Sequence, residues 1–71
     1  MHLYDETGHE YSDGTKVKVG DVVTQGGLGY AGVVMFRINE FFVMVAWIKW
    51  DPQHEGPLYC NENPLRIHKI R

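Results

Sequence analysis

Five side chains could act as soft metal ligands, namely the four histidines and the single cysteine. They are His2, His9, His54, His68 and Cys60. No two of them have the C-x2-C or H-x3-H spacing that presents a pair of ligands to one zinc ion. The sequence therefore predicts no metal site, and no motif in it predicts a bound cofactor.

The candidate nucleophiles lack the groups that would activate them. A catalytic nucleophile needs a neighbouring base and a donor that stabilises the developing charge. Ser12 is the only serine and lies among turn-forming residues, while Cys60 precedes His68 with no oxyanion donor that can be named. A lone thiol is typically a small buried apolar side chain. We therefore expect a protein that is not an enzyme.

A glycine-rich segment runs from Gly26 to Gly32. Such a loop can hold a phosphate with its backbone N–H groups. No helical pattern follows this one, no Gly-Lys-Ser/Thr closes it, and no Lys or Arg lies between Thr24 and Phe36. We interpret it as a connection between two strands.

The charge is unevenly distributed, although the net charge of −2 and the pI of about 6.0 give no overall basic signature. Residues 1–15 form an acidic arm with Asp5, Glu6, Glu10 and Asp13 and no Lys or Arg. Residues 16–71 form a mildly basic body. If the chain binds nucleic acid, the phosphate contacts would come from the basic side chains of this body. They are Lys16, Lys18, Arg37, Lys49, Arg66, Lys69 and Arg71.

The elements that must position these side chains are short strands. Turn-forming residues recur along the whole chain, and no window shows a convincing helical period. We expect a small N-terminal hairpin from residues 3–4 and 9–11 and a 3₁₀ turn near Asn63–Leu65. The expected strands of the body are 16–19, 22–25, 32–38, 42–50, 58–60 and 66–70.

Three further features of the sequence indicate the cellular compartment. A single cysteine allows no disulfide within the chain, which favours a reducing cytoplasm. The first residues lack the basic and apolar regions of a signal peptide, and the near-apolar run from Phe41 to Ile48 is too short to span a bilayer. We expect a cytoplasmic domain with no membrane contact.

The segment 42–50 is apolar on both of its faces. In a strand, Val43, Val45 and Trp47 would share one face. Val34, Phe36 and Ile38 would form the matching face of the preceding strand, so Phe36 and Trp47 are predicted core residues. The opposite face needs a cover, which could be the acidic arm, a protein partner or a second copy of the chain. The side chains predicted to bind that partner are Met35, Phe42, Met44, Ile48 and Trp50.

The order of these segments resembles SH3-like small barrels. The segments are Val19-Gly20-Asp21-Val22-Val23, Gly29–Val34, Val43–Trp47 and Asn63-Pro64-Leu65-Arg66-Ile67. KOW, CAP-Gly and Tudor-type modules look like this over about residues 16–70. The resemblance implies an all-β, five-stranded barrel over 16–71, preceded by an arm or hairpin over 1–15.

This fold hosts many unrelated functions. We expect a non-catalytic binding module that recognises a protein or itself, of a kind often carried by phages and mobile elements. The alternative is a KOW-like nucleic-acid-binding domain.

A further alternative is an enzyme similar to type II dihydrofolate reductase. Gly20-Asp21-Val22-Val23 matches the opening motif of that enzyme. Its active Val-Gln-Ile-Tyr stretch is replaced here by Gly56–Cys60, which keeps only the tyrosine.

Overall fold

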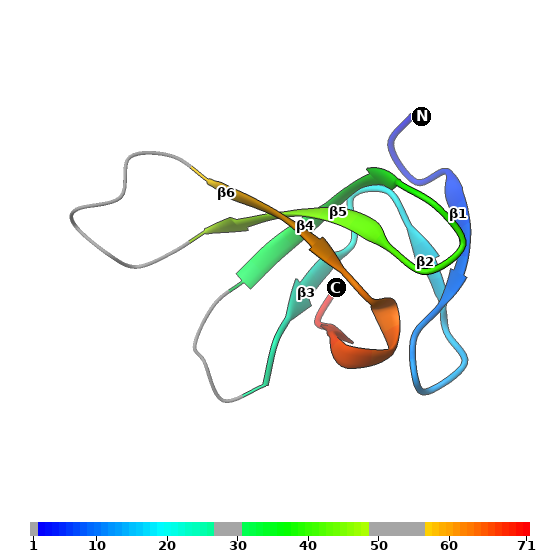
Figure 1. Cartoon of the computed structure of the whole chain (residues 1–71). Coiled ribbons are helices and arrows are strands. Elements are labelled where there is room, and N and C mark those ends of the chain that lie inside the picture. The colour runs from blue at the N-terminus through cyan, green and yellow to red at the C-terminus, as the bar shows by residue number, and fades with distance from the viewer. Residues whose placement is uncertain (1, 27–30, 49–56) are drawn as a thin grey trace.

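The computed structural model describes residues 2–26, 31–48 and 57–71 of the chain (Figure 1). The strands are β1 (Glu6–Glu10), β2 (Lys16–Lys18), β3 (Val22–Thr24), β4 (Ala31–Arg37), β5 (Val43–Ile48), β6 (Leu58–Glu62) and β7 (His68–Lys69). A 3₁₀ turn, η1 (Pro64–Arg66), lies at the expected place. None of the described segments forms a helix long and apolar enough to cross a membrane. The predicted all-β class is confirmed.

Two antiparallel sheets make up the fold. β1 and β2 form a two-stranded sheet, and the other strands form a five-stranded sheet in the order β6-β5-β4-β3-β7. The chain leaves β6 through η1 and returns as β7 at the opposite edge (Figure 1). Within the described residues this sheet is not a closed barrel, because β6 and β7 are its two edges. β7 has only two residues and pairs with β3, and it forms no hydrogen-bonded pairing with β6 that would close the sheet.

The N-terminal hairpin differs from the expected one. Residues 3–4 form no strand, and the pairing is between β1 and β2. Gly8 has a φ of +85° and lies where the register between these strands shifts. Its conformational freedom therefore accommodates a β-bulge rather than a reversal of the chain direction. The chain reverses at Asp13-Gly14, where the Asp13 carboxylate accepts a hydrogen bond from Thr15 N at 2.9 Å. The division proposed at residue 15 falls in this loop and stays a prediction.

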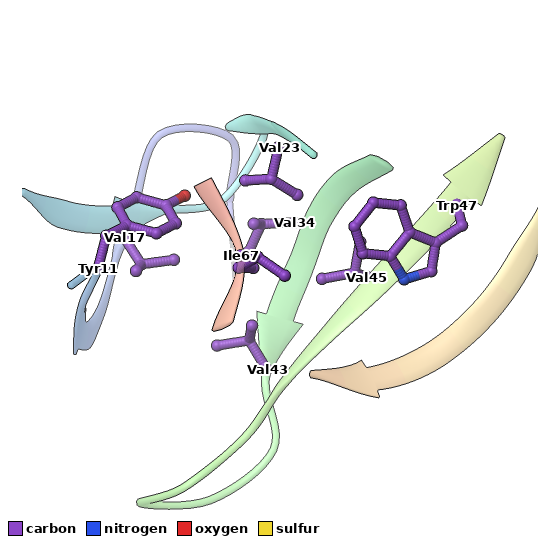
Figure 2. Packing of buried hydrophobic residues seen from close by; sticks show 8 residues of the cluster. All are labelled: Tyr11, Val17, Val23, Val34, Val43, Val45, Trp47 and Ile67. Atoms are coloured by element: carbon purple, nitrogen blue, oxygen red, sulfur yellow. The ribbon is translucent and has the colours of Figure 1, made fainter. Parts of the chain in front are cut away.

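The core lies between the five-stranded sheet and the β1–β2 hairpin (Figure 2). The predicted inward face of β5 is confirmed, since Val43, Val45 and Trp47 are all buried. Ile67, just after η1, is fully buried in the middle of the cluster. The remaining members are Tyr11, Val17, Val23 and Val34, and Cys60 packs against them from β6.

Gly32 makes room for the largest side chain of this core. It pairs with Trp47 across β4 and β5. A Cβ atom at this position would lie 2.6 Å from Val45 Cγ1 and 2.7 Å from Trp47 Cε3. Both distances are shorter than van der Waals contact, and both atoms belong to tightly packed buried side chains. Gly32 therefore allows the close approach of β4 to the Val45 and Trp47 side chains.

A buried carboxylate joins the two sheets. Asp21 is only 4% exposed, and its Oδ2 accepts hydrogen bonds from Tyr11 Oη and from Lys18 N, each at 2.9 Å. Its Oδ1 lies 3.7 Å from Lys69 Nζ on β7, and its backbone oxygen accepts a hydrogen bond from Val34 N at 3.0 Å. Burial, together with the hydrogen bond to Asp21, raises the pKa of Tyr11 well above its ordinary value.

We expect Gly32→Ala to lower the free energy of unfolding by about 1–3 kcal/mol, because the added methyl group overpacks Trp47 and Val45. Urea denaturation followed by tryptophan fluorescence measures the change. Gly26→Ala is the matched control, since among the described residues its Cβ would meet only His68 Cδ2, at an ordinary contact distance of 4.0 Å. Equal stability of the two variants would contradict the close approach.

We expect Tyr11→Phe to cost about 1.5–3 kcal/mol at neutral pH, because it removes a buried hydrogen bond to a carboxylate. The raised pKa adds a pH dependence. Above about pH 10, where an unfolded tyrosine ionises, the folded chain holds one more proton than the unfolded chain, so its stability falls by up to about 1.4 kcal/mol per pH unit. Denaturation curves from pH 8 to 11 should show this loss in the native chain and in the Tyr59→Phe control. Persistence of the same alkaline loss in Tyr11→Phe would refute the assignment.

Candidate binding face

The register of the large sheet decides which side chains share its outer face. Val33, Ala46 and Tyr59 are consecutive cross-strand partners on β4, β5 and β6. Because directly opposite residues project to the same side of a sheet, these three lie together on the face away from the core. The pairs Phe36–Met44 and Ala31–Ile48 extend the same face in both directions. We call Val33, Phe36, Met44, Ala46, Ile48 and Tyr59 the binding face.

The prediction that Phe36 belongs to the core is wrong. The register of β4 against β5 shifts between Val34 and Phe36, which leaves Met35 as an extra residue. Such a bulge reverses the alternation beyond it, since one added residue turns every later side chain to the other face. Val34 thus points into the core, whereas Phe36 lies opposite Met44 on the binding face and is 44% exposed.

The binding face is apolar and open. Ile48 is 54% exposed and Tyr59 is 59% exposed, while Val33 and Met44 are half-buried. Ala46 is buried among these larger neighbours. No charged residue belongs to this set, and the polar cross-strand neighbours Asn61 and Thr24 lie at its borders. Exposed apolar patches on soluble domains typically mark places where another surface binds.

The acidic arm does not cover this face. Tyr4 N donates a hydrogen bond to Val19 O at 2.7 Å, and a Cβ at Gly20 would overlap the side chain of Leu3. β1 then pairs with β2 and also contacts β4 and η1. The arm is thus held against β2 and its following turn, and it leaves Phe36, Ile48 and Tyr59 exposed.

The structure brings together some of the predicted partner-binding residues. Met44 and Ile48 lie on the binding face, and exposed Met35 is the bulge residue beside it. Half-buried Phe42 precedes β5 and lines a separate cavity of about 360 Å³ with Asn61, Glu62 and Arg66. Trp50 lies outside the described residues. Whether any of these residues contacts a partner stays a prediction.

The basic residues are dispersed, and two of them face acidic side chains. Lys16 Nζ lies 3.8 Å from Glu6 Oε1, and Lys69 Nζ lies 3.7 Å from Asp21 Oδ1. Arg37 Nε donates a hydrogen bond to Asn39 O at the end of β4. The others lie on β2 (Lys18), on η1 (Arg66) and after β7 (Arg71), and Lys49 is outside the described residues. Lys16 and Lys18 thus share β2, whereas the other described basic residues are spread over different elements.

The other chemical candidates remain separate. Across residues 2–26, 31–48 and 57–71, no group of three or more His, Cys, Asp or Glu side chains could hold a metal ion. Cys60 is a free, half-buried thiol on β6 that packs against the core. His54 and most of the glycine-rich loop lie outside the described residues.

Sequence reasoning missed two aromatic members of the face, Phe36 and Tyr59. No sequence signal marks the bulge at Met35, so simple alternation placed Phe36 inside. In the predicted strand 58–60, the alternation of side chains does place Tyr59 on the face opposite to that of Leu58 and Cys60. Its position over Ala46 depends on the β5–β6 register, which only the pairing of the strands defines.

No family model, no curated protein and no solved structure matches this chain. What the chain does must therefore be inferred from the geometry of its sheet and from the placement of its charges.

Proposed function

We propose that the chain is a non-catalytic binding module that recognises a protein surface, in the simplest case a second copy of itself, through the binding face. One observation carries the proposal: three large apolar side chains, Phe36, Ile48 and Tyr59, stand exposed around a buried alanine on a sheet face that residues 2–26, 31–48 and 57–71 leave open. Aromatic and methionine side chains are enriched at protein interfaces, and this face contains both.

The rigidity of the face supports this role. Its members lie on three paired strands in the middle and at one edge of the large sheet, so their positions are fixed by backbone hydrogen bonds. A preordered surface loses less conformational entropy when it binds than a loop does. β6, at the edge of the sheet, could also extend the contact by pairing with a strand of the partner.

We further propose that the fold is SH3-like, as the resemblance implies. The 3₁₀ turn η1 ahead of the last strand supports this assignment, as does the Gly20-Asp21 turn before β3. Gly20 has a φ of +93°, the positive value that such a turn requires. In that scheme residues 1–15 are an addition that supplies β1 and places Tyr11 in the core.

The KOW-like alternative receives less support. Lys16 and Lys69 each lie near a carboxylate, which lowers the positive potential available to phosphate. The apolar binding face offers no positive charge of its own. A nucleic-acid complex would also weaken steeply with salt, whereas apolar association depends on salt only slightly.

We expect the native chain to self-associate with rising concentration and Ile48→Asp to remain a monomer, because the variant would bury an unpaired charge in the interface. Sedimentation velocity from about 1 µM to about 1 mM covers the range of weak to moderate dimers. Ile48 is suitable because its exposure allows the monomer to fold. Met44→Asp tests the centre of the same face, with circular dichroism as the check on folding.

Leu65→Asp is the matched control, since Leu65 is equally exposed but lies on η1, away from the binding face. It should associate like the native chain. A native chain that stays monomeric throughout, or one whose association survives Ile48→Asp, would contradict the self-association form of the proposal.

A further inference from the structure

A second depression lies on a different side of the molecule from the binding face. It runs between β1, the loop that joins β4 to β5, and η1, and it has a volume of about 340 Å³. Its walls are Gly8, His9, Glu10, Glu40, Phe41, Asn63, Pro64 and Leu65. We call it the acidic groove.

Two apolar side chains in the acidic groove are open to solvent. Phe41 is 59% exposed and Leu65 is 61% exposed, with buried Pro64 beside them. Both are held in place by local hydrogen bonds. Asn39 Oδ1 accepts from Phe41 N at 2.8 Å, and Asn63 Oδ1 accepts from Leu65 N at 3.0 Å. The groove thus presents two anchored apolar contacts.

The walls of the groove are fixed to one another across the fold. His9 Nε2 lies 2.7 Å from the backbone oxygen of Asn39, so β1 is bonded to the β4–β5 loop. β1 also contacts η1 directly. Within the described residues β1 has a strand partner, β2, along one edge only, and its residues Gly8, His9 and Glu10 line the groove. An extended segment could pair with this edge.

The charge of the groove identifies its occupant. Glu10 and Glu40 line the groove and are both exposed, and none of the residues that line it is Lys or Arg. A smaller depression of about 200 Å³ continues along β1 past Glu6 and Lys16, which pair with each other. An anionic partner would be repelled here, whereas a cationic segment would meet, beside the apolar contacts, two carboxylates for which the described residues provide no ion pair.

We infer that the acidic groove is a second binding site, separate from the binding face, for an extended basic peptide segment of a partner protein. Lysine or arginine side chains of that segment lie against Glu10 and Glu40. An aliphatic side chain between them packs on Phe41 and Leu65. The peptide backbone runs along the free edge of β1.

The test uses the full chain and two short fluorescein-labelled peptides, one alternating lysine with leucine and the other glutamate with leucine. Fluorescence anisotropy at low ionic strength measures their affinities. The lysine peptide should bind and the glutamate peptide should not. The amide resonances of Gly8, Glu40, Phe41 and Leu65 should move on titration, and added salt should weaken the complex.

Three variants locate the complex. Glu10→Gln combined with Glu40→Gln should raise the Kd of the lysine peptide by about three- to tenfold, the loss expected for two exposed charge contacts. Phe41→Ala should raise it by about tenfold, as for an anchor side chain. Asp5→Lys changes the net charge by the same two units as the double variant but lies outside the groove walls, so it should have a much smaller effect.

Several results would overturn the inference: no binding of the lysine peptide, equal binding of the glutamate peptide, or an Asp5→Lys effect as large as that of the double variant. Loss of peptide binding in Ile48→Asp would place the peptide on the binding face instead. The acidic groove and the binding face are thus tested independently, because the groove variants should leave the concentration-dependent mass of the chain unchanged.

Discussion

The carboxylate of Asp21 is the interaction on which the arrangement of both sheets depends. It is buried, and a buried charge is costly unless donors surround it. Two hydrogen-bond donors, Tyr11 Oη after β1 and Lys18 N on β2, and the ammonium group of Lys69 on β7 surround it. Because they are brought together only when the hairpin, β3 and the last strand are in place, the cost of burying Asp21 couples these segments. The hairpin is thereby an integral wall of the core rather than a loose arm.

The large sheet gains its two distinct faces from one glycine and one bulge. Gly32 leaves space for the Trp47 ring, which fills the inner face opposite it. Met35, further along β4, is the extra residue of a bulge that reverses the alternation of side chains. Phe36 therefore lies with Met44 on the outer face of the sheet. The inner face therefore holds Trp47 among β-branched residues, and the largest side chains of β4 and β6 are left on the outer face. A small domain with few core positions cannot bury them all.

The molecule presents two surfaces of different chemistry. The binding face is apolar and lies on paired strands, whereas the acidic groove combines exposed Phe41 and Leu65 with two carboxylates. None of the described basic residues belongs to either surface. Lys16 and Lys69 instead balance Glu6 and Asp21, so part of the positive charge serves the fold. The proposed function and the further inference together describe a module that joins two protein partners, one by apolar contact and one by charge.

The sequence by itself determined the all-β class, the approximate strands of the body, the 3₁₀ turn near Pro64 and the inward face of Val43, Val45 and Trp47. These follow from turn residues and from alternation, which are local signals. The tertiary structure alone decided the register: the bulge at Met35, the outward position of Phe36, the place of Tyr59 over Ala46 and the pairing of Glu6–Glu10 with Lys16–Lys18. The physical reason is that a one-residue shift costs little locally but exchanges the two faces of a strand, so only the packing of the whole core selects one register. The acidic groove, whose walls come from three distant segments, was for the same reason invisible along the chain.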